Sequence, residues 1–355
     1  MTGDCLWRWQ HTPGVDSLSV KTAVEATSFQ DIEGWREDDH CAALACYLRS
    51  AGLANAGLPT PDRGSISALL ADRDKARQFF EQAFLPLRVA AKPGLLTSYF
   101  EPVLKGSRKP SPAFPIPVYR RPADLQFLPS GHELLAANLT AARDLGGSFE
   151  PYFTRADIER GALAGRGLEI LYLADAIEAF IMHVQGSGLI ELDGGSQARL
   201  TFDGKNGHPY TSVARCLIER GLLLAKDADL DGMVSCLRAH PDARAFLQEN
   251  KSYIFFKEMD PAEAGPKGSS GVQLQAGRSL AADPLYHRLG IPIWVSAPGL
   301  SFEGRPFRRL TVAQDTGSAI KGAQRGDIYA GQGVGARSVA GRVRHACEFI
   351  VLQPA

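Results

Sequence analysis

The sequence predicts a mixed α+β fold that is mainly β with helices and is divided between two bodies. Three observations predict it. Apolar residues recur at helical spacing in the first 85 residues, and helical and extended patterns alternate between about residues 150 and 245. After residue 250, short apolar runs are separated by glycine-rich turns. The 355 residues suffice for one large domain or two modest ones.

The N-terminal segment is expected to supply two helices and a strand. Residues 37–54 carry apolar positions at helical spacing. Residues 65–85 predict a second helix that is capped by Ser65 and stopped by Pro86. The run LLTSYFEPVL at residues 95–104 is typical of a strand.

The middle of the chain begins with a proline-rich stretch that suits a crossing between domains. Residues 106–122 hold five prolines. Helical patterns at 174–184 and 211–224 then bracket two short strands, 189–192 and 198–202, which a glycine-rich turn joins.

The C-terminal third has the pattern of a small barrel or sandwich. Its short apolar or alternating runs are SYIFF, IPIWVSA, RRLTVAQD, GDIYAG and CEFIVLQP. We expect the N-terminal segment, residues 1–107, to join the C-terminal segment, residues 246–355, in one domain. Residues 108–245 would then form an inserted domain, and the cleft between the two bodies would bind the ligand.

Composition excludes several classes of protein. Lys+Arg and Asp+Glu both number 39, so the chain lacks the overall positive charge of a dedicated nucleic-acid binder, and no nucleic-acid partner is expected. The most apolar stretches are far shorter than the roughly 20 residues that span a bilayer. We see no signal peptide, and the residues before Cys5 do not form a lipid-attachment box. The six cysteines show no zinc-type spacing, so neither a metal nor a cofactor is expected.

Two aspartates near the C-terminus are the main candidates for chemistry. Asp315 ends one strand-like run and Asp327 opens the next, with a glycine-rich loop that contains Lys321 between them. Strand ends in a barrel can bring such carboxyl groups together, and apolar neighbours can raise the pKa of one of them so that it acts as an acid. The alternative interpretation is that both aspartates cap surface turns.

Three further clusters combine amides, hydroxyls and aromatic rings on tight loops, which is the chemistry that sugar binding uses. Each could equally be an ordinary turn. Their candidate residues for glycan contacts are Tyr99 and Glu101, Gln185 and Ser187, and Asn206.

Familiar catalytic motifs are otherwise missing. The run DTGS at residues 315–318 matches pepsin-like proteases, but their chemistry needs a second such motif or a short homodimeric chain, and this sequence has no second D-[ST]-G. It also lacks a G-x-S-x-G elbow, a phosphate-binding P-loop and an H-E-x-x-H helix.

Taken together, residues 94–355 resemble the membrane-bound lytic transglycosylase A family of murein-cleaving enzymes. The resemblance lies in ordered motifs: LLTSYFEPVLKGSR, FTRADIERGAL, AFIMHVQGSGLIEL, FDGKNGHPYTSVARCLIERG, GPKGSSGVQLQAGRSLAADP and AQDTGSAIKGAQRGDIYAG. The chain departs from the family pattern at Asn250-Lys251, where Asn-Pro is usual, and at Tyr99-Phe100, where a tyrosine pair is usual. Residues 1–90 match less distinctly.

This resemblance implies a double-psi β-barrel built from N- and C-terminal segments, with an inserted β-rich domain. It implies a peptidoglycan lytic exo/endo-transglycosylase, a carbon–oxygen lyase acting on polysaccharides. Such an enzyme cuts the β-1,4 bond between N-acetylmuramic acid and N-acetylglucosamine and leaves 1,6-anhydromuramoyl ends. The resemblance assigns the single catalytic acid and base to Asp327 and matches Asp315 to the family's other aspartate, which we expect to support the site through its charge or by fixing its loop. We also expect glycan contacts from Tyr99, Glu101, Gln185, Ser187, Asn206 and Lys321.

The expected partners are peptidoglycan glycan strands, with other cell-wall enzymes as candidates. The expected location is the periplasm, with any outer-membrane association through a lipid anchor that this chain does not show. Two alternatives remain open. One is a glycoside hydrolase that uses Asp315 and Asp327 as a pair. The other is a murein-binding protein without catalytic activity.

Overall fold

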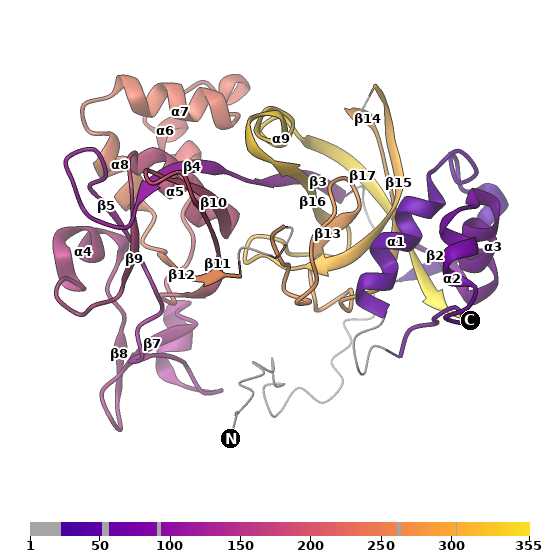
Figure 1. Ribbon diagram of the computed structural model, residues 1–355, viewed down its shortest axis with the longest axis horizontal. Helices are drawn as coiled ribbons and strands as arrows, with labels where there is room; N and C mark the ends of the chain where they lie inside the picture. Colours follow the sequence, from indigo (N-terminus) through magenta and orange to yellow (C-terminus); the bar gives the residue numbers. More distant parts are fainter. Residues whose placement is uncertain (1–22, 52–56, 91–93, 261–262, 264, 303) are drawn as a thin grey trace.

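The computed structural model describes residues 23–51, 57–90, 94–260, 263, 265–302 and 304–355, which fold into two bodies lying side by side (Figure 1). The N-terminal region that bears on a signal peptide, including Cys5, lies outside the described residues. The larger sheet comprises β1 Val24–Ala26, β2 Phe84–Val89, β3 Gly94–Glu101, β13 Ser279–Ala282, β14 Pro292–Phe302, β15 Arg305–Asp315, β16 Arg325–Gln332 and β17 Arg344–Pro354.

Six of these strands close into a barrel. The order β17-β14-β15-β13-β16-β3 returns to its start because β17 also pairs with β3. Two of the pairs, β3 with β16 and β13 with β15, are parallel, and the other pairs around the ring are antiparallel. The structure thus confirms the predicted mixed α+β fold with a barrel that draws strands from both ends of the chain.

Packing inside the barrel leaves little room for a side chain at Gly326, the residue before Asp327. A Cβ atom on Gly326 would lie 2.8 Å from Phe349 Cζ and 2.9 Å from Leu280 Cδ1, and both of those side chains are fully buried. A side chain here would therefore displace Leu280 on the neighbouring strand β13 and Phe349 on β17 inside the barrel. This explains the glycine of the GDIY motif.

Three helices cover one side of the barrel: α1 His40–Ala51, α2 Ile66–Leu70 and α3 Arg73–Ala83. The prediction of a single helix over 65–85 is wrong. Asp72 interrupts it, because its side chain accepts hydrogen bonds from the backbone N–H groups of Asp74 and Lys75 and so caps α3. The hydroxyl of Ser65 makes no cap and donates instead to the carbonyl of Asp62.

The second body is built on a six-stranded sheet in the order β12-β11-β10-β4-β9-β5 and a small three-stranded sheet, β6-β7-β8. Their bounds are β4 Val103–Ser107, β5 Ile116–Tyr119, β6 Leu125–Phe127, β7 Ala141–Asp144, β8 Phe149–Pro151, β9 Glu169–Leu173, β10 Ser187–Leu192, β11 Gln197–Lys205 and β12 Ile254–Met259. Its helices are α4 Arg155–Asp157, α5 Ala176–Gln185, α6 Val213–Glu219, α7 Leu230–Ala239 and α8 Ala243–Glu249.

The chain passes between the bodies at Pro102. The single strand expected over 95–104 is divided there, so that β3 belongs to the barrel and β4 to the second sheet. Proline cannot donate a backbone hydrogen bond, which suits a residue between two sheets. The SYIFF run, expected in the C-terminal barrel segment, forms β12 of the second sheet. The domain boundaries at 107/108 and 245/246 themselves stay predictions.

Some of the remaining helices and strands were predicted from the sequence, and others were not. The helices expected at 174–184 and 211–224 and the hairpin between them are present as α5, α6, β10 and β11. The short strand β13, helices α7 and α8, and helix α9 Gly333–Ala340 were not predicted. No helix among the described residues is long and apolar enough to span a membrane.

Candidate active site

Asp327, the candidate catalytic acid, lies on β16, which pairs with β3. In the parallel pairing of these strands, Asp327 is opposite Thr97 and Tyr329 is opposite Tyr99. The hydroxyl of Thr97 donates a 2.5 Å hydrogen bond to Oδ1 of Asp327. Alternation along a strand places Thr97, Tyr99 and Glu101 on the same face. One face of β3 therefore carries a row of three polar side chains.

The pKa of Asp327 is raised to about 6. Burial of the carboxyl group is the main cause, and the negative charge of Asp315 adds to it. The hydrogen bond from Thr97 and the positive charge of Arg325 oppose this rise. A carboxyl group in this state carries a proton for part of the time near neutral pH and can give it to a substrate.

The second aspartate has a different environment. Oδ1 of Asp315 accepts hydrogen bonds from the Ser269 N–H at 2.9 Å, the Ser269 hydroxyl at 2.8 Å and the Thr316 N–H at 2.9 Å. Its Oδ2 accepts one from the Tyr99 hydroxyl at 2.9 Å. Burial still raises the pKa of Asp315, but each of these donors lowers it. Four donors leave Asp315 with little freedom to exchange protons or to move.

The two carboxyl groups therefore differ in what they can do. Asp327 accepts one hydrogen bond within the described protein, from Thr97, and keeps its other oxygen available. Asp315 is held at both oxygens and contributes negative charge near Asp327. Such a pair suits an acid that is tuned by a fixed neighbour better than two interchangeable acids.

The remaining residue of the polar row connects β3 to the second sheet. Glu101 is fully buried, and its Oε1 lies 3.2 Å from Nε of Arg199 on β11. Burial raises the pKa of Glu101 to about 7, against the opposing charge of Arg199. Between Glu101 and the aspartates, the rings of Tyr99 and Tyr329 lie 5.4 Å apart. In this structure Glu101 faces Arg199 rather than solvent, so any glycan contact from it stays a prediction.

The predicted residue Asn206 anchors a loop. It is fully buried, and its side-chain amide donates to the carbonyls of Phe153 and Lys251, both at 2.8 Å. Its side-chain oxygen accepts from the N–H of Tyr253 at 2.9 Å. These bonds use the whole side chain to hold backbone, so a direct glycan contact from Asn206 also stays a prediction.

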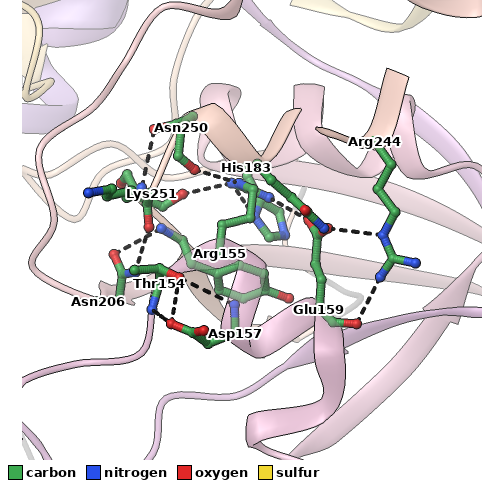
Figure 2. Close-up of polar contacts among 12 residues, drawn as sticks. Thr154, Arg155, Asp157, Glu159, His183, Asn206, Arg244, Asn250 and Lys251 are labelled. Carbon is green, nitrogen blue, oxygen red and sulfur yellow. Dashed lines mark hydrogen bonds and ion pairs between the residues drawn. The ribbon is translucent and has the colours of Figure 1, made fainter. Parts of the chain in front are cut away.

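A buried arginine completes this anchor, as Figure 2 shows. Arg155 begins α4 and is 3% exposed. Its guanidinium donates to the carbonyls of Asn250 at 3.2 Å and Ser252 at 2.8 Å, and it lies 3.2 Å from Nδ1 of His183. Because Asn206 holds Lys251 and Arg155 holds the residues on either side, the backbone of residues 250–252 is fixed at three successive carbonyls.

Gln185 is the last residue of α5, and Ser187 is the first residue of β10. The side-chain oxygen of Gln185 accepts a hydrogen bond from the N–H of Phe100 at 2.9 Å, and thus joins the second body to the end of β3. Ser187 opens β10 opposite Thr201 and is partly exposed. Gln185 also lines a pocket of about 170 Å³ between α5 and α7, which neither aspartate lines.

Several residues of the site were missed by the sequence analysis. Thr97 and Ser269, which bond the two aspartates, are separated from them by 230 and 46 residues. The alternation of β3 offered a signal for Thr97, since it stands two residues before Tyr99 on the same face. Arg155 lies in the FTRADIERGAL motif, which drew attention to the segment without assigning this residue a role, and no comparable signal marked Arg199. Within the described residues, no group of three His, Cys, Asp or Glu side chains is arranged to hold a metal.

Comparisons with known proteins agree with this arrangement. A family model described as the MltA specific insert domain matches residues 95–257, and a 3D domain model matches residues 278–353. The chain is 34% identical over 259 residues to membrane-bound lytic murein transglycosylase A of Vibrio cholerae and 33% identical over 266 residues to that of Escherichia coli K12. These matches cover 71% and 73% of this chain, but they span only 63% and 65% of the relatives.

Solved structures extend the likeness to almost the whole chain. A membrane-bound lytic murein transglycosylase from Agrobacterium tumefaciens superposes with a TM-score of 0.82 at 34% identity, covering 94% of this chain and 98% of that one. The E. coli MltA structure with bound chitohexaose superposes with a TM-score of 0.69 at 26% identity, covering 89% and 90%.

Proposed function

Because this chain belongs to the membrane-bound lytic murein transglycosylase A family, we propose that it cleaves murein glycan strands. The bond cut is the β-1,4 linkage between N-acetylmuramic acid and N-acetylglucosamine, and the product carries a 1,6-anhydromuramoyl end. Binding of chitohexaose by the E. coli structure supports a glycan as the ligand.

The observation that carries this proposal is the asymmetry of the two aspartates. The pKa of Asp327 is raised to about 6, and its carboxyl group accepts one hydrogen bond from the described residues, whereas Asp315 is held by four donors. A hydrolase that uses two carboxylates needs the second one as a nucleophile or as a base that activates water. Asp315 is poorly placed for either role because its oxygens are already occupied. A single acid that later serves as the base fits the geometry better.

The reaction then takes two proton transfers at Asp327. The protonated carboxyl group gives its proton to the glycosidic oxygen, the bond from that oxygen to the anomeric carbon breaks, and the N-acetylglucosamine alcohol departs. The carboxylate left behind takes the proton of the muramoyl 6-hydroxyl as its oxygen bonds to the same anomeric carbon. Asp327 ends protonated as it began, and no water is consumed. An attacking group that belongs to the substrate itself contributes favourable proximity.

Asp315 supports this cycle through its charge. Its carboxylate raises the pKa of Asp327 and so favours the protonated form that begins the reaction. The Tyr99 hydroxyl and the 269–270 turn hold Asp315 in position for that effect. Asp315 is thus a positioning and electrostatic residue in this proposal, not a second acid.

Mass spectrometry of fragments released from purified murein tests the proposal. Wild-type protein should release anhydromuramoyl ends, which are one water lighter than reducing ends, and Asp327→Ala should release none. Reducing-end products would instead identify a hydrolase. Binding without release by either protein would favour a murein-binding protein that has no catalytic activity.

Murein as substrate also sets the proposed location and partners. The protein would act on glycan strands in the periplasm. This location follows from its relatives, which are membrane-bound enzymes named for their action on murein. Fractionation of cells that produce the full-length protein, followed by immunoblotting, would test this location.

A further inference from the structure

The chain crosses between the two bodies twice, and Arg199 of the second body contacts both crossings. The first crossing is at Pro102, between β3 and β4, and the second is the segment between β12 and β13. Nε of Arg199 lies 3.2 Å from Oε1 of Glu101, the last residue of β3. Its Nη1 donates a 2.7 Å hydrogen bond to the carbonyl of Glu263, which lies in the second crossing. One guanidinium group therefore joins the two connecting segments.

The strands around Arg199 fix its position at the first crossing. Arg199 is opposite Leu189 in the antiparallel pair of β11 and β10, and the N–H of Leu189 donates a 2.9 Å hydrogen bond to the carbonyl of Pro102. The N–H of Phe100 donates to the side-chain oxygen of Gln185 at 2.9 Å. The second body thus binds backbone groups on both sides of the carboxylate that Arg199 contacts.

The contact between Glu101 and Arg199 is a poorly satisfied ion pair. Glu101 has no exposed surface, and Arg199 is 9% exposed. Within the described residues, neither oxygen of Glu101 accepts a hydrogen bond, and Nε of Arg199 donates none. Burying two charges costs free energy, which a pair without aligned hydrogen bonds offsets only in part. The stability of the fold therefore gives little reason for a charged pair at this place.

The two bodies are also joined elsewhere. Helix α9 lies on the side of the barrel that faces the second body (Figure 1), and Nη1 of Arg337 on this helix donates a 2.7 Å hydrogen bond to Oε2 of Glu178 on α5. This ion pair does not involve Arg199. Replacing Arg199 should consequently leave the bodies attached and change their relative orientation.

Resting on the function proposed above, we propose that Arg199, through Glu101 and the carbonyl of Glu263, is a positioning residue that sets the orientation of the second body relative to Asp327. A glycan strand long enough to contact both bodies is then held with its scissile bond at the carboxyl group of Asp327. Displacing a reacting bond by about 1 Å can cost about 100-fold in rate, so a small change in orientation is sufficient to slow cleavage. A short substrate bound at Asp327 alone does not depend on this orientation.

Cleavage kinetics on a long and a short substrate test the proposal. The long substrate is a peptide-free murein strand, and the short one is a tetrasaccharide of alternating N-acetylglucosamine and N-acetylmuramic acid that contains one cleavable bond. We expect Glu101→Gln to lower kcat on the long strand about tenfold and to change KM less than about threefold. On the tetrasaccharide, kcat should stay within about twofold of wild type.

Urea unfolding separates positioning from a purely structural role. Glu101→Gln removes a buried charge, so its unfolding midpoint at pH 8 should equal or exceed that of wild type. Arg220→Met is the matched control, because Arg220 pairs with Glu249 at 2.7 Å within the second body and reaches neither crossing. It should leave the kinetics on both substrates unchanged.

A double variant tests whether Glu101 acts through Arg199. If the two side chains work as a unit, Glu101→Gln combined with Arg199→Met should lose no more of kcat than Arg199→Met alone. Losses that add would mean that Glu101 acts on the glycan by itself, and they would overturn the proposal. An equal loss on both substrates, no loss on either, or a loss that accompanies a lower unfolding midpoint in Glu101→Gln would also overturn it.

The products that wild-type protein releases test the proposed function separately. If anhydro products form and Glu101→Gln behaves as wild type on the long strand, the positioning role is wrong and the function stands. If reducing ends form, the transglycosylase proposal is wrong and the same kinetic comparison still decides the role of Arg199. If nothing is released, calorimetry of the two substrates takes the place of kinetics, and weaker binding by Glu101→Gln confined to the long strand supports the orientation role.

Discussion

The barrel and the second body use polar side chains for opposite purposes. On the barrel, one oxygen of Asp327 accepts no hydrogen bond from the described residues, and the pKa of this carboxyl group is raised. In the second body, the side chains of Arg155 and Asn206 donate hydrogen bonds to the backbone carbonyls of residues 250–252. A buried polar side chain whose donors and acceptors all bind protein groups contributes rigidity. A side chain that has a donor or acceptor without a protein partner can use that group to bind or react with a substrate. This difference predicts which substitutions will affect activity and which will affect stability.

The largest expected effect comes from Asp327→Asn. If Asp327 serves as both acid and base, murein cleavage should fall about 1,000-fold, within the range that general acid–base catalysis contributes. Release of anhydromuramoyl fragments measures this change. Residual activity within tenfold of wild type would mean that another group carries the proton.

The same variant should also change how stability depends on pH. Because the folded-state pKa of Asp327 is raised to about 6 from an ordinary value of 3.8, its contribution to stability is fully present below about pH 3.8 and is lost as the pH rises through 6. Asp327→Asn lacks this loss, so relative to wild type its Tm should be higher at pH 8 than at pH 4. Thermal unfolding at the two pH values measures the difference, and an equal offset at both would contradict it.

The next largest effect is expected on stability, from Arg155→Met. Removing the guanidinium leaves the carbonyls of Asn250 and Ser252 without their buried donor, which should cost about 3 kcal/mol in the free energy of unfolding. Arg244→Met is the control, because Arg244 is exposed and should cost less than about 0.5 kcal/mol. Urea unfolding measures both, and equal costs would show that the buried network does not matter.

Asp315→Asn should change the pH dependence of murein cleavage more than it changes the stability of the fold. Loss of its negative charge lowers the pKa of Asp327, so less of the acid is protonated near neutral pH. We expect cleavage at pH 7 to fall about tenfold and the alkaline limb of the profile to move to lower pH. A profile superimposable on that of wild type would exclude the supporting role.

Thr97→Val should produce the smallest change and in the opposite direction. The Thr97 hydroxyl stabilises the Asp327 carboxylate, so its removal raises the pKa of Asp327. The alkaline limb of the cleavage profile should move to higher pH by less than about one unit, with the maximal rate changed only a few-fold. Thr97→Ser keeps the hydroxyl and should preserve the wild-type limb.

Much of the candidate site followed from short motifs. The GDIY and DTGSAIKG runs placed Asp327 and Asp315 at strand ends, and the run over 95–104 marked Tyr99 as a candidate on a strand, but its contact with Asp315 is seen only in the structure. The roles of Glu101 and Asn206 could not be read in the same way. Both occur in glycine-rich or aromatic motifs that suggest exposure, yet both are fully buried, because the other body or another loop packs against them.

The sequence by itself determined the local alternation of β3, β15 and β16, the helical faces, and the motifs by which the chain resembles its family. These properties depend on residues close together in the chain. The tertiary structure alone decided that Thr97 meets Asp327 across 230 positions, that Pro102 divides one apparent strand between two sheets, and that Phe349 and Leu280 crowd the position of Gly326. Strand pairing and burial are set by the packing of distant segments, and no local pattern specifies which segment will be the neighbour.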